Sequence, residues 1–167
     1  MVRPICPHVL HALALLALLV LLAACGSTPG PRTSPAPTTS SAAAADPLVY
    51  AAALVASTNE ARDVEGLPAL AVSECAERAA ADRAQALVGE QELEHAPLDG
   101  VLRDCAPSAK AAENLSRATA PAADVVDAWL GSPGHRDNLL DPDLSEVGVA
   151  CVEDAGRLLC AQVFLGP

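Results

Sequence analysis

The sequence predicts an α+β domain over residues 47–167, and the residues before it do not resemble folded structure. Apolar residues recur at helical spacing through most of the domain, which predicts a set of amphipathic helices. Near the C-terminus the period changes to alternation, which predicts a β-hairpin. Four cysteines lie within the domain, and in an exported chain they are expected to pair as disulfides.

Residues 1–24 have the pattern of a secretory signal peptide. Their only charge is Arg3, and the apolar run Leu10–Leu22 follows it. This run is shorter than the roughly 20 apolar residues that a membrane-spanning helix needs. The leader ends in LAACG, which resembles the lipobox of bacterial lipoproteins, so we expect cleavage before Cys25 and a lipid anchor on its sulfur. An ordinary signal-peptidase site that leaves a free thiol is the alternative.

Residues 25–46 are rich in Ser, Thr, Pro, Gly and Ala, and such a segment cannot bury enough apolar surface to order itself. We expect a tether that holds the domain at the outer face of a bacterial cell membrane. The formal net charge is -11, and it becomes about -12 when Arg3 leaves with the signal peptide. Because the chain has no clusters of Lys or Arg, nucleic acid is not an expected partner.

The first part of the domain is predicted to hold two long helices. The first covers Pro47–Val64, because proline suits its first turn, apolar residues share one face, and Gly66 lies just past its end. The second runs from the N-cap Ser73 to about Val88, with acidic residues near the positive end of its dipole. Its apolar face is largely alanine, which predicts close packing against a neighbour.

Shorter elements are predicted in the middle of the domain. His95 follows the second helix in a loop or at the end of a strand, and residues 107–116 are predicted to form a helical turn that holds Glu113. Another helix covers Ala122–Leu130 and packs the only tryptophan on an apolar stripe. A Gly/Pro break follows this helix, and His135–Leu140 then forms one or two further turns.

The C-terminal hairpin is predicted to turn at Ala155 and Gly156. Apolar and polar positions alternate on both arms, and with that two-residue loop Cys151 lies opposite Cys160. A disulfide between these two cysteines is therefore geometrically reasonable.

Cysteine pairing is only partly fixed by the sequence. One cysteine leaves with the signal peptide and Cys25 is expected to carry lipid, so four remain and three pairings are possible. We favour Cys151 with Cys160 and Cys75 with Cys105. The second bridge would close a loop around His95 and contribute about 3 kcal/mol in the chain-entropy description. A metal site made of four thiolates is the alternative, but no CxxC spacing is present.

An ordered set of motifs runs through residues 48–165. In chain order the motifs are Asn59-x2-Arg62, His95, Glu113-Asn114-Leu115, Trp129-x2-Ser132-x2-His135-Arg136-x-Asn138, Val147-Gly148-Val149 and Gln162-Val163-Phe164. This set resembles bacterial domains of the CAP superfamily, also called SCP-like domains. Their relatives include plant pathogenesis-related proteins and animal cysteine-rich secretory proteins.

The resemblance implies a three-layer α-β-α sandwich with a central cleft lined by two histidines and acidic residues. His95 matches the first cleft histidine, Glu113 matches the glutamate of the Glu-Asn motif, and His135 matches the second histidine. Eukaryotic members have a second glutamate where this chain has Ser132. An activity that needs two carboxylates is therefore not expected.

His95, Glu113 and His135 together form a plausible ligand set for zinc or another divalent cation, since three protein ligands and an open water position describe catalytic zinc sites. The alternative is structural, with histidines that pack and a glutamate that accepts hydrogen bonds from backbone amides. A serine hydrolase built on Ser132 and His135 is not expected, because there is no Gly-x-Ser-x-Gly motif and Pro133 follows the serine.

Three classes of function are compatible with these residues. The first, which we favour, is an extracellular binding domain that holds a metal ion, a lipid or a cell-envelope component in the cleft. The second is a metal-assisted or acid/base hydrolase that acts in the cell envelope. The third is a structural surface lipoprotein whose cleft is vestigial.

Overall fold

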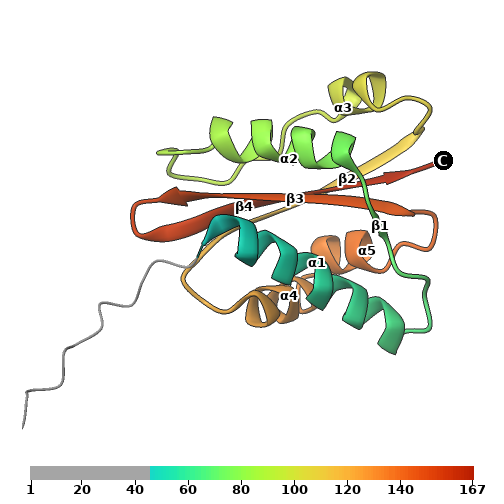
Figure 1. The fold of residues 1–167 in the computed structure, drawn as a ribbon, viewed down its shortest axis with the longest axis horizontal. Helices are drawn as coiled ribbons and strands as arrows, with labels where there is room; N and C mark the ends of the chain where they lie inside the picture. Colours follow the sequence, from blue (N-terminus) through green and yellow to red (C-terminus); the bar gives the residue numbers. More distant parts are fainter. Residues whose placement is uncertain (1–45) are drawn as a thin grey trace, which may run out of the picture. The chain divides into compact units, whose positions relative to one another are not determined.

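A four-stranded sheet in the order β1-β3-β4-β2 forms the middle layer of the domain (Figure 1). The computed structural model describes residues 46–167, so the predicted signal peptide, Cys25 and nearly all of the predicted tether lie outside the described residues. Antiparallel pairing joins β3 to β4 and β4 to β2, whereas β1 pairs in parallel with β3. The strands are β1 (Ala71–Val72), β2 (Lys110–Ala118), β3 (Glu146–Asp154) and β4 (Arg157–Gly166).

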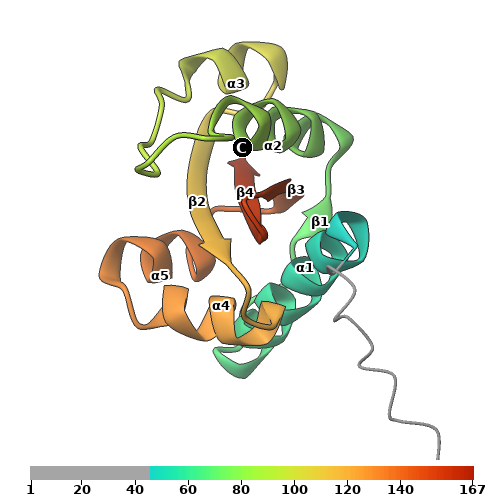
Figure 2. The same ribbon diagram turned by 90° about the vertical axis from the view of Figure 1, so that its left-hand side faces the viewer.

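Helices cover both faces of this sheet, as Figure 2 shows with the sheet seen end on. On one face lie α1 (Pro47–Val64), α4 (Ala122–Leu130) and α5 (Pro133–Leu139), and on the other lie α2 (Glu74–Ala86) and α3 (Asp99–Asp104). The three-layer α-β-α arrangement is therefore confirmed. No helix within residues 46–167 is both long and apolar enough to cross a membrane.

Two apolar clusters fill the space between the layers. The cluster between the sheet and α1 contains Leu54, Trp129 and Phe164, all buried. The cluster under α2 contains its alanines together with residues of β4. The alanine face predicts close packing correctly, because a Cβ atom added at Gly148 of β3 would lie 2.1 Å from the backbone nitrogen of Glu77.

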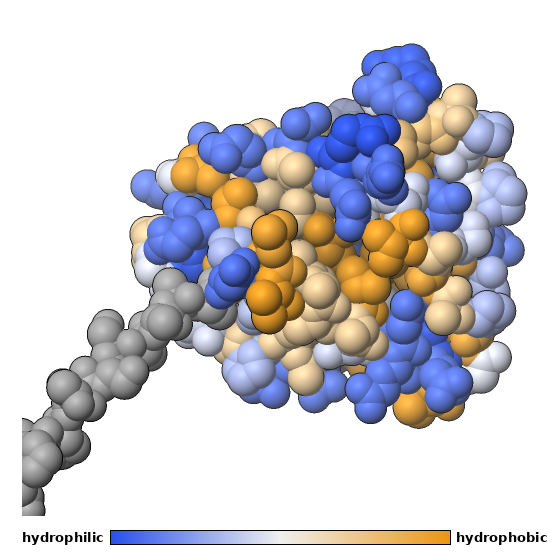
Figure 3. All heavy atoms as spheres, viewed as in Figure 1, coloured by the Kyte–Doolittle hydropathy of each residue, from blue (hydrophilic) through white to orange (hydrophobic). Residues whose placement is uncertain are grey.

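The outer surface of this domain is mixed. On the face shown in Figure 3, apolar residues gather in the middle and hydrophilic residues surround them. Large apolar side chains that are exposed include Leu48, Val49 and Val64 of α1 and Val72 of β1.

Local signals in the sequence account for the elements that are predicted correctly. Helix α1 has the predicted bounds, and the side chain of Asp46 accepts a hydrogen bond from the Leu48 N–H at its start. The hairpin turns at Ala155 and Gly156, whose φ angles are 52° and 78°. Two consecutive residues with positive φ are the signature of a type I′ turn, which suits the twist of a hairpin.

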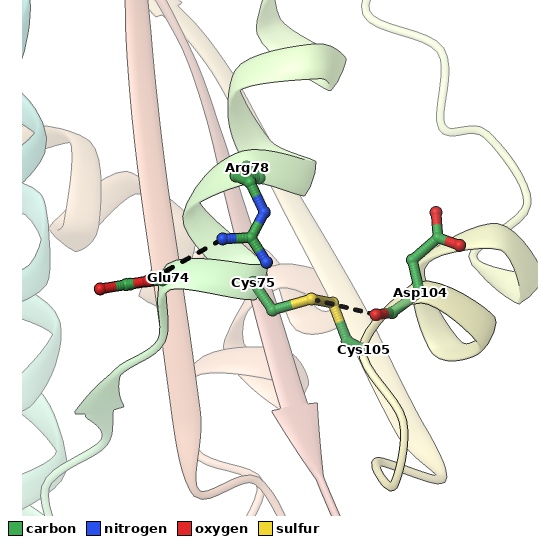
Figure 4. The surroundings of a disulfide bond; sticks show 5 residues. All are labelled: Glu74, Cys75, Arg78, Asp104 and Cys105. Carbon is green, nitrogen blue, oxygen red and sulfur yellow. Dashed lines mark hydrogen bonds and ion pairs between the residues drawn. A yellow bond between two sulfur atoms is a disulfide. The ribbon is translucent and has the colours of Figure 1, made fainter.

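Both favoured disulfides are present. Cys151 pairs with Cys160 across the hairpin, with a Cα–Cα distance of 4.1 Å. Cys75 at the start of α2 pairs with Cys105 at the end of α3, as Figure 4 shows. The Cys75–Cys105 bridge therefore joins α2 to the end of α3, and the segment that carries His95 lies between these two helices.

One predicted element is wrong: residues 107–116 do not form a helical turn. Instead, Lys110–Ala118 is strand β2, which pairs with β4 along its full length. The segment is rich in Ala, Glu, Leu and Arg, which favour helices, so the pairing with β4 overrides its local preference. The short elements β1 and α3 are not predicted from the sequence at all.

Candidate functional site

The four cleft residues predicted from the sequence line one pocket of about 380 Å³. His95 comes from the loop between α2 and α3, and Glu113 comes from β2. Ser132 and His135 come from the beginning of α5, where Pro133 starts the helix and Ser132 is its N-cap residue. The structure thus brings together residues that lie up to 40 positions apart in the sequence.

Glu113 is the buried centre of this group. Its carboxylate is 2% exposed, and Oε1 lies 2.8 Å from Nδ1 of His95. Its other oxygen, Oε2, accepts a hydrogen bond of 2.9 Å from Nε of Arg83. Both carboxylate oxygens therefore contact side chains, and the expected alternative of bonds from backbone amides is wrong. Arg83 is a site residue that the sequence does not reveal.

The contact with Glu113 also fixes the position of the proton on the His95 ring. An ionised carboxylate can only accept, so the ring nitrogen facing it, Nδ1, must donate its N–H. In the neutral ring, Nε2 then keeps its lone pair and is free to accept a hydrogen bond or to bind a cation.

His135 is the second imidazole of the pocket. Its ring centroid lies 6.4 Å from that of His95 and 6.4 Å from that of Trp129. Burial lowers the pKa of His135 below its usual value, and the nearby His95 lowers it further. The neutral imidazole is therefore the favoured form of His135 at pH 7.

Helix α5 is held in place by a chain of amides, of which Asn114 and Gln162 are buried and Asn138 is half-buried. Asn138 donates to the carbonyl of Glu113 at 3.1 Å and to Oδ1 of Asn114 at 3.0 Å. Asn114 in turn donates to Gln162 of β4 at 3.3 Å, and Gln162 donates to Thr58 of α1 at 2.9 Å. This network connects α1, the sheet and α5, so it fixes the backbone that carries the second cleft histidine.

The far end of α5 is held by Arg62. This arginine is buried, and its guanidinium donates to the backbone carbonyls of Leu139 and Asp141 at 2.9 and 3.0 Å. It therefore satisfies the Leu139 carbonyl, which the end of the helix leaves without a partner, and also holds the segment just beyond the helix.

The arrangement only partly fits the metal site that the sequence predicts. Within residues 46–167, no group of three or more His, Cys, Asp or Glu side chains is placed to hold a metal ion. Glu113 is already engaged by Arg83 and His95, which leaves two imidazoles. Two imidazoles on one tetrahedral zinc ion have ring centroids about 5 Å apart, given Zn–N distances of about 2.1 Å. The observed 6.4 Å would have to shorten by about 1 Å for a shared ion.

A larger apolar hollow of about 590 Å³ lies elsewhere, beside the first turn of α1 and the turn of the hairpin. No histidine or cysteine lines it. Both histidines and the buried carboxylate of Glu113 line the smaller pocket, which we therefore take as the candidate functional site.

Comparison with known proteins agrees with this fold. The family model of the cysteine-rich secretory protein family, CAP, matches residues 55–164. The chain belongs to this family. The CAP domain is 29% identical over 143 residues to YkwD of Bacillus subtilis (strain 168), an uncharacterized protein, and the match covers 81% of this chain. It covers 54% of YkwD, so this chain spans about half the length of that relative.

Solved structures show the same fold at low sequence identity. A cysteine-rich secretory protein of Staphylococcus aureus has a TM-score of 0.65 at 22% identity, and the match covers 74% of this chain and 40% of that protein's chain. An extracellular protein of Bacillus anthracis with an SCP domain has a TM-score of 0.63 at 21% identity, covering 72% and 41%. An outer surface protein of Borrelia burgdorferi has a TM-score of 0.58 at 20% identity, covering 68% and 89%.

Proposed function

We propose that this CAP domain is an extracytoplasmic binding domain whose cleft takes a small ligand on the imidazoles of His95 and His135. The observation that carries the proposal is the convergence of these two rings, from separate elements, on one pocket beside a buried carboxylate. The lowered pKa of His135 favours its neutral form, and in a neutral His95 ring the hydrogen bond to Glu113 leaves Nε2 with its lone pair. Both rings can therefore offer a nitrogen acceptor.

A divalent cation is the ligand that suits such acceptors best. Imidazole nitrogen is a preferred ligand for zinc, and ligating histidines usually donate their other N–H to a carboxylate or carbonyl group. Glu113 would serve as this orienting group for His95 rather than as a ligand. Oxygen atoms of water or of a cell-envelope component would complete the coordination of the ion.

The test is a calorimetric titration of Zn²⁺ into the chain that lacks residues 1–24 and carries Cys25→Ser. This chain contains only the two cleft histidines, because the other two lie in the leader. We expect one binding event in the wild type and its loss in His95→Ala and in His135→Ala. Equal titration of the wild type and the double variant would contradict the proposal. Arg78→Ala is the matched control, because this exposed side chain does not line the pocket.

An acid/base hydrolase is the second candidate function. It is favoured by the 2.8 Å contact between His95 and Glu113, which is the arrangement of a general base and its orienting carboxylate. Hydrolysis of lipid, peptide or glycan substrates that disappears in both His95→Ala and Glu113→Gln would support this candidate. A cation bound without turnover on these substrates would favour the binding domain.

We also propose that the mature chain is anchored to the outer face of the cell membrane through lipid on Cys25, with residues 25–46 as the tether. The LAACG sequence supports this anchor, and the two disulfides support an oxidising compartment. Two structural neighbours are described as extracellular and as an outer surface protein. Cys25→Ala should release the protein from the membrane fraction, and unchanged membrane association would contradict the anchor.

A further inference from the structure

Arg83 connects the two groups that flank the His95 side chain, the backbone beside it and the carboxylate that contacts its ring. Its Nε donates to Oε2 of Glu113 at 2.9 Å, and its Nη2 donates to the backbone carbonyl of Glu94. Glu94 directly precedes His95, and Glu113 contacts the His95 ring. The contacts close a ring that runs from Arg83 through Glu94, His95 and Glu113 back to Arg83.

We infer that Arg83 is a positioning residue of the cleft. Its guanidinium fixes the orientation and the tautomer of His95, because it holds both the backbone beside that residue and the carboxylate that accepts from its ring. This inference concerns the same site as the proposed function and rests on it.

Packing alone does not hold the His95 ring. The side chain of His95 is 53% exposed, and the loop before it has no regular secondary structure. A hollow of about 820 Å³ lies along residues 89–97, and another of about 640 Å³ lies between α2 and α3. Arg83 and Ala96 line both hollows. With open space beside this segment, hydrogen bonds rather than packing must set the position of the histidine.

Two arginines divide the anchoring of this loop. Arg117 donates to the carbonyl of Leu87 at 3.0 Å and to that of Gln91 at 3.5 Å, so it holds the first half. Arg83 holds the second half through Glu94. Among the described residues, Arg83 is the arginine that also contacts Glu113, so of these two arginines it is the one that links the loop backbone to the carboxylate.

The chemistry of the guanidinium suits this role. A carboxylate that is only 2% exposed needs a partner in the protein, because its burial without one is costly. Arginine presents several N–H donors in one rigid plane, so it can serve Glu113 and the Glu94 carbonyl at once. Lysine has a single point charge on a flexible stem and cannot reproduce both contacts with the same geometry.

The experiment uses the chain without residues 1–24 and with Cys25→Ser, in which two histidines remain. Long-range ¹H–¹⁵N NMR at pH 8.5 reports which ring nitrogen of each histidine carries the proton. In the wild type we expect His95 as the Nδ1–H tautomer. In Arg83→Ala we expect both tautomers of His95 to be populated, with His135 unchanged. Arg78→Ala on the same helix is the control, because its side chain is 69% exposed and pairs with Glu74 at 3.9 Å.

Zinc affinity gives the second measurement. Loss of a group that orients a ligating histidine typically lowers metal affinity about 10- to 100-fold, and we expect a loss in this range for Arg83→Ala. Arg83→Lys should recover part of it, because the charge opposite Glu113 returns while the second contact does not. Fluorescence of Trp129 and circular dichroism verify folding, and Arg83→Gln replaces Arg83→Ala if the alanine variant does not fold.

The outcomes separate the two proposals. Unchanged His95 tautomers in folded Arg83→Ala or Arg83→Gln would overturn the role of Arg83, even if the wild type binds zinc. A changed tautomer in a chain whose wild type binds no zinc would support the role of Arg83 and contradict the cation-binding function.

Discussion

Replacement of Gly148 by alanine tests how closely α2 approaches the sheet. The added Cβ atom would lie 2.1 Å from the backbone nitrogen of Glu77 and 2.2 Å from the carbonyl carbon of Ala76. Ordinary contacts begin at 3.4 Å, so the first distance must grow by about 1.3 Å (3.4 minus 2.1). The obstructing atoms belong to the helix backbone, so no side-chain rotation can relieve the overlap.

The expected cost follows from this displacement. Extra atoms in a well-packed interior typically cost 1–3 kcal/mol, and a shift of a whole helix belongs at the upper end, about 3 kcal/mol. In a domain of this size each kcal/mol lowers Tm by about 3–5 °C, so Gly148→Ala should melt roughly 10–15 °C below the wild type. Thermal unfolding followed by circular dichroism measures this difference.

Gly100→Ala is the matched control for this experiment. Gly100 lies in α3, and a Cβ atom there would meet only the end of the Arg103 side chain at 3.7 Å. Alanine is the better helix former by about 1 kcal/mol, so this variant should melt at or slightly above the wild-type temperature. If Gly148→Ala melts within about 2 °C of the wild type, α2 does not approach β3 as closely as the structure has it.

Three further predictions concern stability. Burial raises the pKa of Asp141, but the hydrogen bonds from Lys110 and from the Asp143 N–H, together with the charges of Lys110 and Arg62, outweigh burial and lower the net pKa below 3.8. The stabilisation by the ionised Asp141 is therefore complete above pH 3.8 and is lost as pH falls through the folded-state pKa. In urea unfolding, Lys110→Met should therefore be less stable than the wild type at pH 7, and this difference in the free energy of unfolding should shrink below pH 3.8. Asp154→Ala removes the carboxylate whose Oδ2 lies 2.7 Å from Nε of the buried Arg117 side chain. The free energy of unfolding in urea should fall by about 3–5 kcal/mol, and a loss below about 1 kcal/mol would refute the buried pair. Trp129→Phe removes the 3.1 Å hydrogen bond from Nε1 to the Leu115 carbonyl of β2. The free energy of unfolding should fall by about 1–3 kcal/mol in the same assay, and an unchanged unfolding midpoint would contradict this bond.

The elements that the sequence predicts are those with local signals. Helix α1 is marked by Asp46 and Pro47, which act within its own first turn. The hairpin is marked by Ala155-Gly156 and by the alternation on either side. Strand β2 has no such signal, because most of its residues individually favour a helix and their partners in β4 lie 40 to 56 positions away.

The site divides in the same way. His95, Glu113 and His135 could be named from the resemblance to a family, and the structure places all three on one pocket. Arg83 could not be named in this way, because its partners lie 11 and 30 positions away in the sequence. No sequence pattern distinguishes it from Arg78 on the same helix. A contact between distant positions becomes visible only when the sheet sets the register of β2 beneath α2.

The strand conformation of β2 explains why glutamate and asparagine stand next to each other in the cleft motif. Successive side chains of a strand point to opposite faces of the sheet. Glu113 therefore reaches the layer of α2, where Arg83 lies, while Asn114 reaches the layer of α1 and α5, where it contacts Gln162 and Asn138. A helix would place these two neighbours about 100° apart and could not direct them to two separate layers.

The same geometry accounts for the outer edge of β2. The carbonyls of Glu113 and Leu115 lie two residues apart along this edge, and they accept hydrogen bonds from Asn138 of α5 and Trp129 of α4. An uncovered edge strand offers such groups to other chains, so these side chains also block unwanted pairing. Because one helical pair covers the edge and also presents His135, a change that loosens β2 at this edge must also move the second histidine of the cleft.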